Sequence, residues 1–208
     1  MKKISMPILV AVFGAGLLIN PVPAHAQIYD TFGPGDTFDT NDFVSFTQGG
    51  GLDEYADRFT SPATENVSLV QIALEGVTAD ASITLSIHSN SGNEPAGPTG
   101  IIGTFAPVTL PSDPAVVTFE ATTDFELEAN TEYWLTASAS NGQIEWFYND
   151  QGIQNFTSAH IGGSWNTEDV PGMALAFEIN QVPEPESLPL CATGLGVWLL
   201  GRYLRRPR

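Results

Sequence analysis

The hydrophobic pattern of residues 66–179 is that of short β-strands. Between residues 83 and 88 (ITLSIH), apolar side chains alternate with polar ones, and this period of two predicts a half-buried strand. Runs rich in β-branched and aromatic residues also cover 66–77, 116–120, 125–128, 133–135, 144–148 and 173–179. Gly, Pro, Asn and Ser clusters separate these runs, and no dozen-residue stretch shows a helical stripe. The pattern predicts an all-β domain, an antiparallel β-sandwich of jelly-roll or immunoglobulin-like type.

Residues 27–51 differ from the rest of this region. Phenylalanines are interspersed there with aspartates, and Gly49 begins a run of three glycines. We interpret this stretch as an edge strand or a wrapping arm followed by a flexible turn.

The first 26 residues have the three parts of a secretory signal peptide. Lys2 and Lys3 precede an apolar run over 6–19, and Ala24-His25-Ala26 supplies small residues at the cleavage-determining positions. A retained anchor is the alternative, but the run is shorter than the ~20 apolar residues of a membrane span. We therefore predict cleavage before Gln27.

The last 27 residues, 182–208, read as a second processed segment. Pro183-Glu184-Pro185 gives an extended lead, and an apolar segment follows over 188–201. As a helix that segment rises only about 21 Å, less than the ~30 Å hydrocarbon core, so it predicts a marginal, temporary transmembrane helix. The basic residues after it are expected to stay cytoplasmic; these are Arg202, Arg205, Arg206 and Arg208. The predicted acidic domain therefore covers residues 27–181.

Charge is distributed very unevenly along the chain. All 24 Asp and Glu residues lie between Asp30 and Glu186, where Arg58 is the only Lys or Arg, and the formal charge there is −23. This balance excludes nucleic acid and anionic lipid surfaces as partners, since both require clustered cations. Cys191 is the only cysteine and lies in the apolar segment, so residues 27–181 contain no disulfide.

The C-terminal residues resemble the PEP-CTERM sorting signal of Gram-negative bacteria. The resemblance is carried by Val182-Pro183-Glu184-Pro185, by the apolar segment with its Gly-Leu-Gly and Trp-Leu-Leu-Gly runs, and by the closing arginines. It implies transient insertion in the inner membrane, processing by an exosortase near Pro183, Glu184 and Pro185, and delivery to the cell surface or extracellular matrix.

The exported region resembles the choice-of-anchor type R domains. The motifs that carry this resemblance lie at 57–60 (DRFT), 88–97, 122–127 (TTDFEL), 130–135 (NTEYWL) and 162–165 (GGSW). It implies a β-sandwich and surface display, and it brings no catalytic residues.

Catalytic motifs are absent from the sequence of the exported region. It has no Gly-x-Ser-x-Gly elbow and no cysteine, and its histidines are His88 and His160. His88 falls on the polar face of its strand, so we expect it to be exposed. Glycoside hydrolysis uses a pair of carboxylates. Among 24 acidic residues some pair always lies at a suitable distance, so such a pair does not indicate a hydrolase. We predict that the protein is not an enzyme.

Calcium binding is a better candidate role for these acids than catalysis, because Ca²⁺ prefers hard oxygen ligands. One candidate set is Asp36, Asp39, Asn41 and Asp42, and another is Asp53, Glu54 and Asp57. Neither fits an EF-hand, and a solvated acidic loop is the alternative for each.

Aromatic side chains raise a second binding possibility, a stacking platform for sugar rings. Most of the tryptophans and neighbouring aromatics are expected in the core. Trp165 follows Gly162-Gly163-Ser164 and is the best candidate for an exposed loop aromatic. We expect Arg58 to pair with a neighbouring carboxylate.

These observations favour an exported protein with a structural or adhesive role in exopolysaccharide or biofilm. The alternative is a carbohydrate-binding module that uses exposed aromatics such as Trp165.

Overall fold

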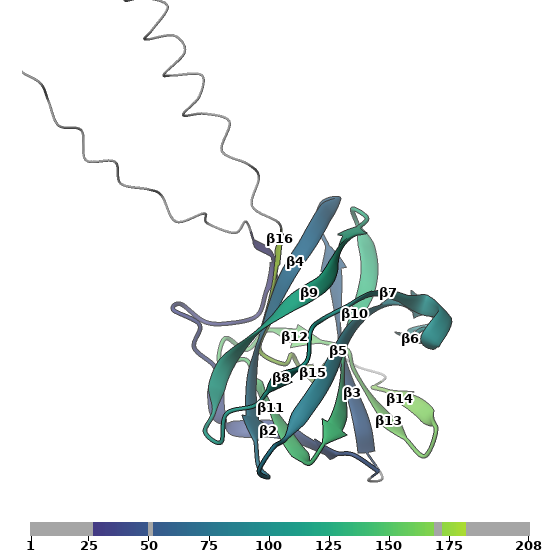
Figure 1. Ribbon diagram of the computed structural model, residues 1–208. Coiled ribbons are helices and arrows are strands. Elements are labelled where there is room, and N and C mark those ends of the chain that lie inside the picture. The colour runs from purple at the N-terminus through teal and green to yellow at the C-terminus, as the bar shows by residue number, and fades with distance from the viewer. Residues whose placement is uncertain (1–26, 50–51, 169–171, 182–208) are drawn as a thin grey trace, which may run out of the picture.

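The computed structural model describes residues 27–49, 52–168 and 172–181 (Figure 1). The predicted signal peptide and the predicted sorting tail lie outside these residues. The described residues fold as antiparallel β-sheets, and every strand pairing among them is antiparallel. Their only helical element is the short 3-10 turn η1 (Pro98–Gly100). The described part contains no helix that is long and apolar enough to cross a membrane.

Three sheets are present in the described part of the chain. The six-stranded sheet contains β1 (Gln27–Asp30), β2 (Asp39–Thr47), β4 (Glu65–Gly76), β9 (Ala115–Leu127), β11 (Gln143–Tyr148) and β16 (Phe177–Gln181). The eight-stranded sheet contains β3 (Leu52–Ser61), β5 (Ser82–Ser91), β6 (Glu94–Pro95), β7 (Ile101–Thr104), β8 (Val108–Thr109), β10 (Thr131–Asn141), β13 (Thr157–Ile161) and β14 (Ser164–Thr167). A small two-stranded sheet pairs β12 (Gln154–Asn155) with β15 (Gly172–Met173).

The main hydrophobic core joins the two large sheets, as the period of two predicts. Phe59 from β3 and Phe177 from β16 meet edge to face, with ring centroids 6.1 Å apart. Trp146 from β11 packs on the same Phe177 at 6.2 Å. Each of these side chains is fully buried, and burying one contributes about 1.5–3 kcal/mol. The arrangement is consistent with a β-sandwich.

The N-terminal stretch supplies both an edge strand and a wrapping arm. The arm between β1 and β2 packs Phe32 and Phe38 against Phe147, which forms a second, smaller apolar cluster. Trp146 faces the main core and Phe147 faces this smaller cluster, because successive side chains on a strand point to opposite faces.

The two ends of the described domain lie side by side. Gln27 in β1 pairs with Asn180 in β16, so the domain begins and ends at the same edge of the six-stranded sheet (Figure 1). Both predicted processed segments therefore join the domain at neighbouring points.

Candidate functional site

A cleft of about 600 Å³ lies on the outer face of the eight-stranded sheet. Its floor is made by side chains of the three adjacent strands β3, β10 and β5, namely Glu54, Thr136, Ser138, Thr84, Ser86 and His88. On these strands the alternate side chains, such as Leu85 and Leu135, point inward to the main core. The sequence alternation that builds the core therefore also builds a polar floor outside it.

The first wall of the cleft is the β13–β14 hairpin. Gly162 and Gly163 form its turn with φ values of 61° and 88°, a left-handed conformation that glycine adopts without a Cβ penalty. This turn places His160 directly opposite Trp165, with ring centroids 5.1 Å apart. Asp53 Oδ1 lies 3.0 Å from His160 Nδ1 and helps to fix the imidazole. The hairpin thus presents a positioned aromatic surface to the cleft.

The second wall is the segment from Ala96 to Ile101, which includes η1. Figure 1 shows β6, which leads into this segment, and the β13–β14 hairpin on the same side of the molecule. His88 holds the wall in place, since its Nδ1 is hydrogen-bonded to the Ala96 carbonyl oxygen and its Nε2 lies 2.8 Å from Ser86 Oγ. A carbonyl accepts only, so His88 Nδ1 is the donor to Ala96.

Two expectations about these residues are corrected. His88 is only 8% exposed, because the 96–101 segment folds over its strand. Trp165 lies on strand β14 and not in a loop, and it is half-buried against His160. Its placement at the cleft nevertheless keeps it available as a binding aromatic.

Thr136 is an unusual part of the floor. The residue is 3% exposed, and its Oγ1 has no hydrogen-bond partner among the described residues. A buried hydroxyl without a partner costs about 1–3 kcal/mol. The cleft therefore carries a destabilising polar group at its base.

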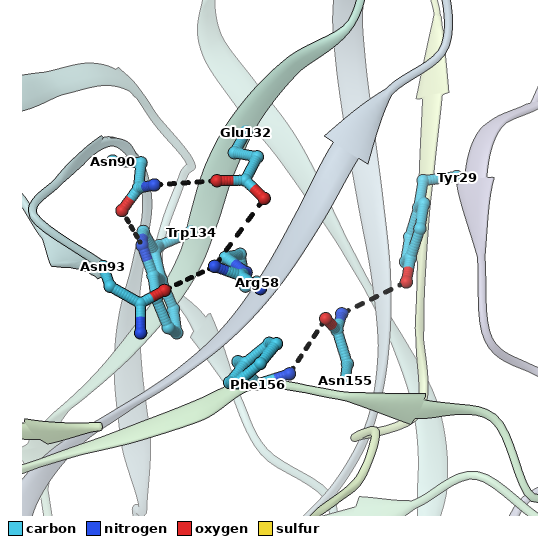
Figure 2. A network of polar contacts seen from close by, with 8 residues as sticks. All are labelled: Tyr29, Arg58, Asn90, Asn93, Glu132, Trp134, Asn155 and Phe156. Carbon is cyan, nitrogen blue, oxygen red and sulfur yellow. Dashed lines mark hydrogen bonds and ion pairs between the residues drawn. The ribbon is translucent and has the colours of Figure 1, made fainter. Parts of the chain in front are cut away.

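Arg58 ties the turn before the second wall to the sheet (Figure 2). Its Nη1 donates to Asn93 Oδ1 and lies 3.6 Å from Glu132 Oε1. The guanidinium carbon lies 4.0 Å from the ring centroid of Phe156 and 5.9 Å from that of Trp134. The expected pairing with a carboxylate is confirmed, but the partner comes from the adjacent strand β10.

Asn90 completes this network. Its Nδ2 donates to Glu132 Oε2 at 2.9 Å, and its Oδ1 accepts from Trp134 Nε1 at 3.1 Å (Figure 2). Trp134 is fully buried, and its indole N–H has a hydrogen-bond partner in Asn90, so its role is to stabilise the fold.

Asp57 lies on the opposite face of β3, inside the protein. Its Oδ2 accepts from the Leu175 backbone N–H at 2.6 Å, while Oδ1 has no partner among the described residues. Burial raises the pKa of Asp57 well above its ordinary value, and nearby Glu168 adds to this increase. Burial, together with the Asp57 charge, also raises the pKa of Tyr29 to about 12.

The candidate calcium ligands are only partly brought together. Asn41 donates to Asp39 Oδ1 from both its backbone N–H, at 2.9 Å, and its Nδ2, at 3.1 Å. Asp36 occupies the turn of the preceding arm with a φ of 59°. In the alternative set, Asp53 binds His160, Glu54 lines the cleft and Asp57 is buried.

No cluster of three or more His, Cys, Asp or Glu side chains suited to a metal occurs in residues 27–49, 52–168 and 172–181. Calcium binding at Asp36, Asp39, Asn41 and Asp42 stays a prediction. The sorting residues Pro183, Glu184 and Pro185 and the four C-terminal arginines lie outside the described residues.

A scan against protein-family models and a search of curated proteins find no match to this chain. The geometry of the cleft is therefore the main basis for a functional proposal.

Sequence reasoning named Asp53 and Glu54 only as candidate calcium ligands, and it missed most of the cleft, including Thr136 and the Asp53–His160 contact. One signal pointed to its first wall: a two-residue Gly162-Gly163 turn pairs residues that lie equally far on either side of it. His160 and Trp165 each lie two residues from this turn, so the hairpin pairs them.

Proposed function

We propose that this protein is an exported, non-catalytic saccharide-binding protein with an adhesive role in an extracellular polysaccharide matrix. The observation that carries the proposal is the cleft in which Trp165 faces a floor of hydroxyl, carboxylate and imidazole groups. Sugar rings have apolar faces and hydroxyl edges, and a site of one aromatic and several fixed polar groups suits both.

The volume of the cleft supports a ligand of a few sugar rings. Small-molecule sites commonly measure about 300–1,000 Å³, and this cleft has about 600 Å³. Its hydrogen-bonding groups lie on strands β3, β10 and β5 of the eight-stranded sheet, and this sheet holds them in position before a ligand binds.

Two features favour binding over hydrolysis. Glu54 is the only carboxylate among the described residues that line the cleft, whereas glycoside hydrolysis ordinarily uses a flanking pair. Both ring nitrogens of His88 are engaged within the protein, which favours a role in holding the second wall.

Export and tail processing form the second part of the proposal. The resemblance of residues 182–208 to a PEP-CTERM signal, together with the signal-peptide pattern of residues 1–26, supports delivery across the inner membrane, exosortase processing and release to the cell surface. Within the β-sandwich class, we propose a jelly-roll or immunoglobulin-like topology.

Co-sedimentation with matrix polysaccharide tests the binding function. The protein is expected to sediment with the polysaccharide, and Trp165→Ala is expected to remain in the supernatant. Phe43→Ala is the matched control, since Phe43 is 40% exposed on β2 of the other sheet. Equal binding by wild type and Trp165→Ala contradicts the proposed site.

Mass spectrometry of the exported protein tests the processing. The proposal predicts a C-terminus near Pro183–Pro185, and a mature chain that still ends at Arg208 contradicts it.

A further inference from the structure

The charges around the cleft bear on which saccharides it accepts. Glu54 Oε1 accepts one hydrogen bond, from Ser138 Oγ at 3.3 Å. Within the described part of the chain Arg58 pairs with Glu132 and His160 contacts Asp53, and Glu54 has no cationic partner there. Its carboxylate therefore faces the cleft with unneutralised charge.

The His160 and Arg58 side chains, which could neutralise this charge, are already engaged. His160 directs Nδ1 to Asp53, and the Arg58 side chain is held by Asn93, Glu132 and the Phe156 ring. Residues 27–181 carry 22 acids against this one arginine. A field of that sign attracts cations to the cleft and repels anions.

We propose, building on the saccharide-binding function above, that the cleft is selective for amino sugars. Trp165 contacts the apolar face of a hexosamine ring, and Glu54 accepts hydrogen bonds from its protonated amine. Charge-assisted bonds of this kind are shorter and stronger than neutral ones. Uronate, sulfated and phosphorylated glycans are disfavoured by the same charge.

Calorimetric titration with four hexasaccharides tests this selectivity. The ligands are glucosamine hexamer, its N-acetylated counterpart, a neutral glucose hexamer and a uronate hexamer. Acetylation removes the cationic charge and keeps the ring, so it is the sharpest comparison. We expect the glucosamine hexamer to bind about fivefold or more tightly than the acetylated one, and this advantage to shrink as salt is added.

The outcomes separate this inference from the proposed function. If the acetylated, neutral or uronate hexamer binds as tightly as the glucosamine hexamer, the amine selectivity is wrong and the saccharide-binding function stands. If none of the four binds and matrix polysaccharide is not retained, both are wrong.

The Glu54→Gln variant tests whether Glu54 is the source of the preference for the glucosamine hexamer. It is expected to lower affinity for the glucosamine hexamer about fivefold and to leave affinity for the neutral hexamer unchanged. Glu120→Gln makes the same charge change at an exposed position on β9, in the other sheet, and is expected to bind like wild type. Equal losses in the two variants would assign the effect to overall charge and overturn the role of Glu54.

Discussion

The His160 imidazole and the Trp165 indole face each other across the β13–β14 hairpin, with ring centroids 5.1 Å apart. This contact orients the aromatic surface of the cleft. His160 is itself held by Asp53, so Trp165 is supported by His160 directly and by Asp53 through it.

Removal of the His160 ring is expected to weaken saccharide binding without touching Trp165. Aromatic contacts contribute about 0.5–1.5 kcal/mol, so His160→Ala should lower affinity about two- to tenfold. His160→Phe keeps a ring in place and should retain most of the affinity. Calorimetric titration of both variants measures this difference, and equal losses in the two would show that the ring contact does not position Trp165.

Arg58 is expected to stabilise the fold mainly through its stacked ring contact. Arg58→Lys keeps the charge but loses the planar group over Phe156, and we expect a cost of about 1–2 kcal/mol in the free energy of unfolding. Glu132→Gln weakens an ion pair whose acid is 43% exposed, and we expect a cost below about 1 kcal/mol. Urea unfolding compares them, and a larger cost for Glu132→Gln would contradict this ranking.

Asp57 is expected to make stability fall as pH rises. Its pKa is raised in the folded state, so the folded protein holds a proton that the unfolded chain releases above about pH 3.8. The stabilisation from Asp57 is therefore complete below that pH and is lost as pH rises through the folded-state pKa.

Asp57→Asn removes this titration. Between pH 4 and pH 7 the free energy of unfolding should fall less for the variant than for wild type, because Asn carries no titrating proton. Asp113→Asn, at an exposed turn, should keep the wild-type pH profile. Parallel profiles for Asp57→Asn and wild type in urea unfolding would contradict the raised pKa.

Thr136→Val is expected to stabilise the protein by about 1 kcal/mol, because it replaces an unpaired buried hydroxyl with a methyl group of similar shape. Thr84→Val is the matched control on β5, where the hydroxyl is exposed and lies 2.7 Å from Ser140 Oγ. Thermal unfolding should show a higher midpoint only for Thr136→Val, and a lower midpoint would show that the Thr136 hydroxyl has a stabilising partner.

The sequence predicts those parts of the fold that depend on local alternation. The polar floor follows directly from the strand pattern around Ile83–His88, because outward side chains share one face. The burial of Asp57 follows the same alternation, since it falls between the core residues Tyr55 and Phe59.

The remaining features depend on which strands become neighbours. Glu132 reaches Arg58, and Ser138 reaches Glu54, only because β10 pairs with β3. His88 is buried because the 96–101 segment, which begins eight residues later, closes over it, although its own strand pattern places it on a polar face. Such contacts arise from topology and have no signature within a single strand.

The most direct test of saccharide binding at this cleft is a backbone amide NMR titration with soluble oligosaccharides released from the matrix polysaccharide. Saccharide binding at the cleft predicts that shifts concentrate on β14, β10, β3 and the 96–101 wall, with the Trp165 indole N–H among the largest. Shifts absent there, or confined to the six-stranded sheet around Phe43, would contradict it.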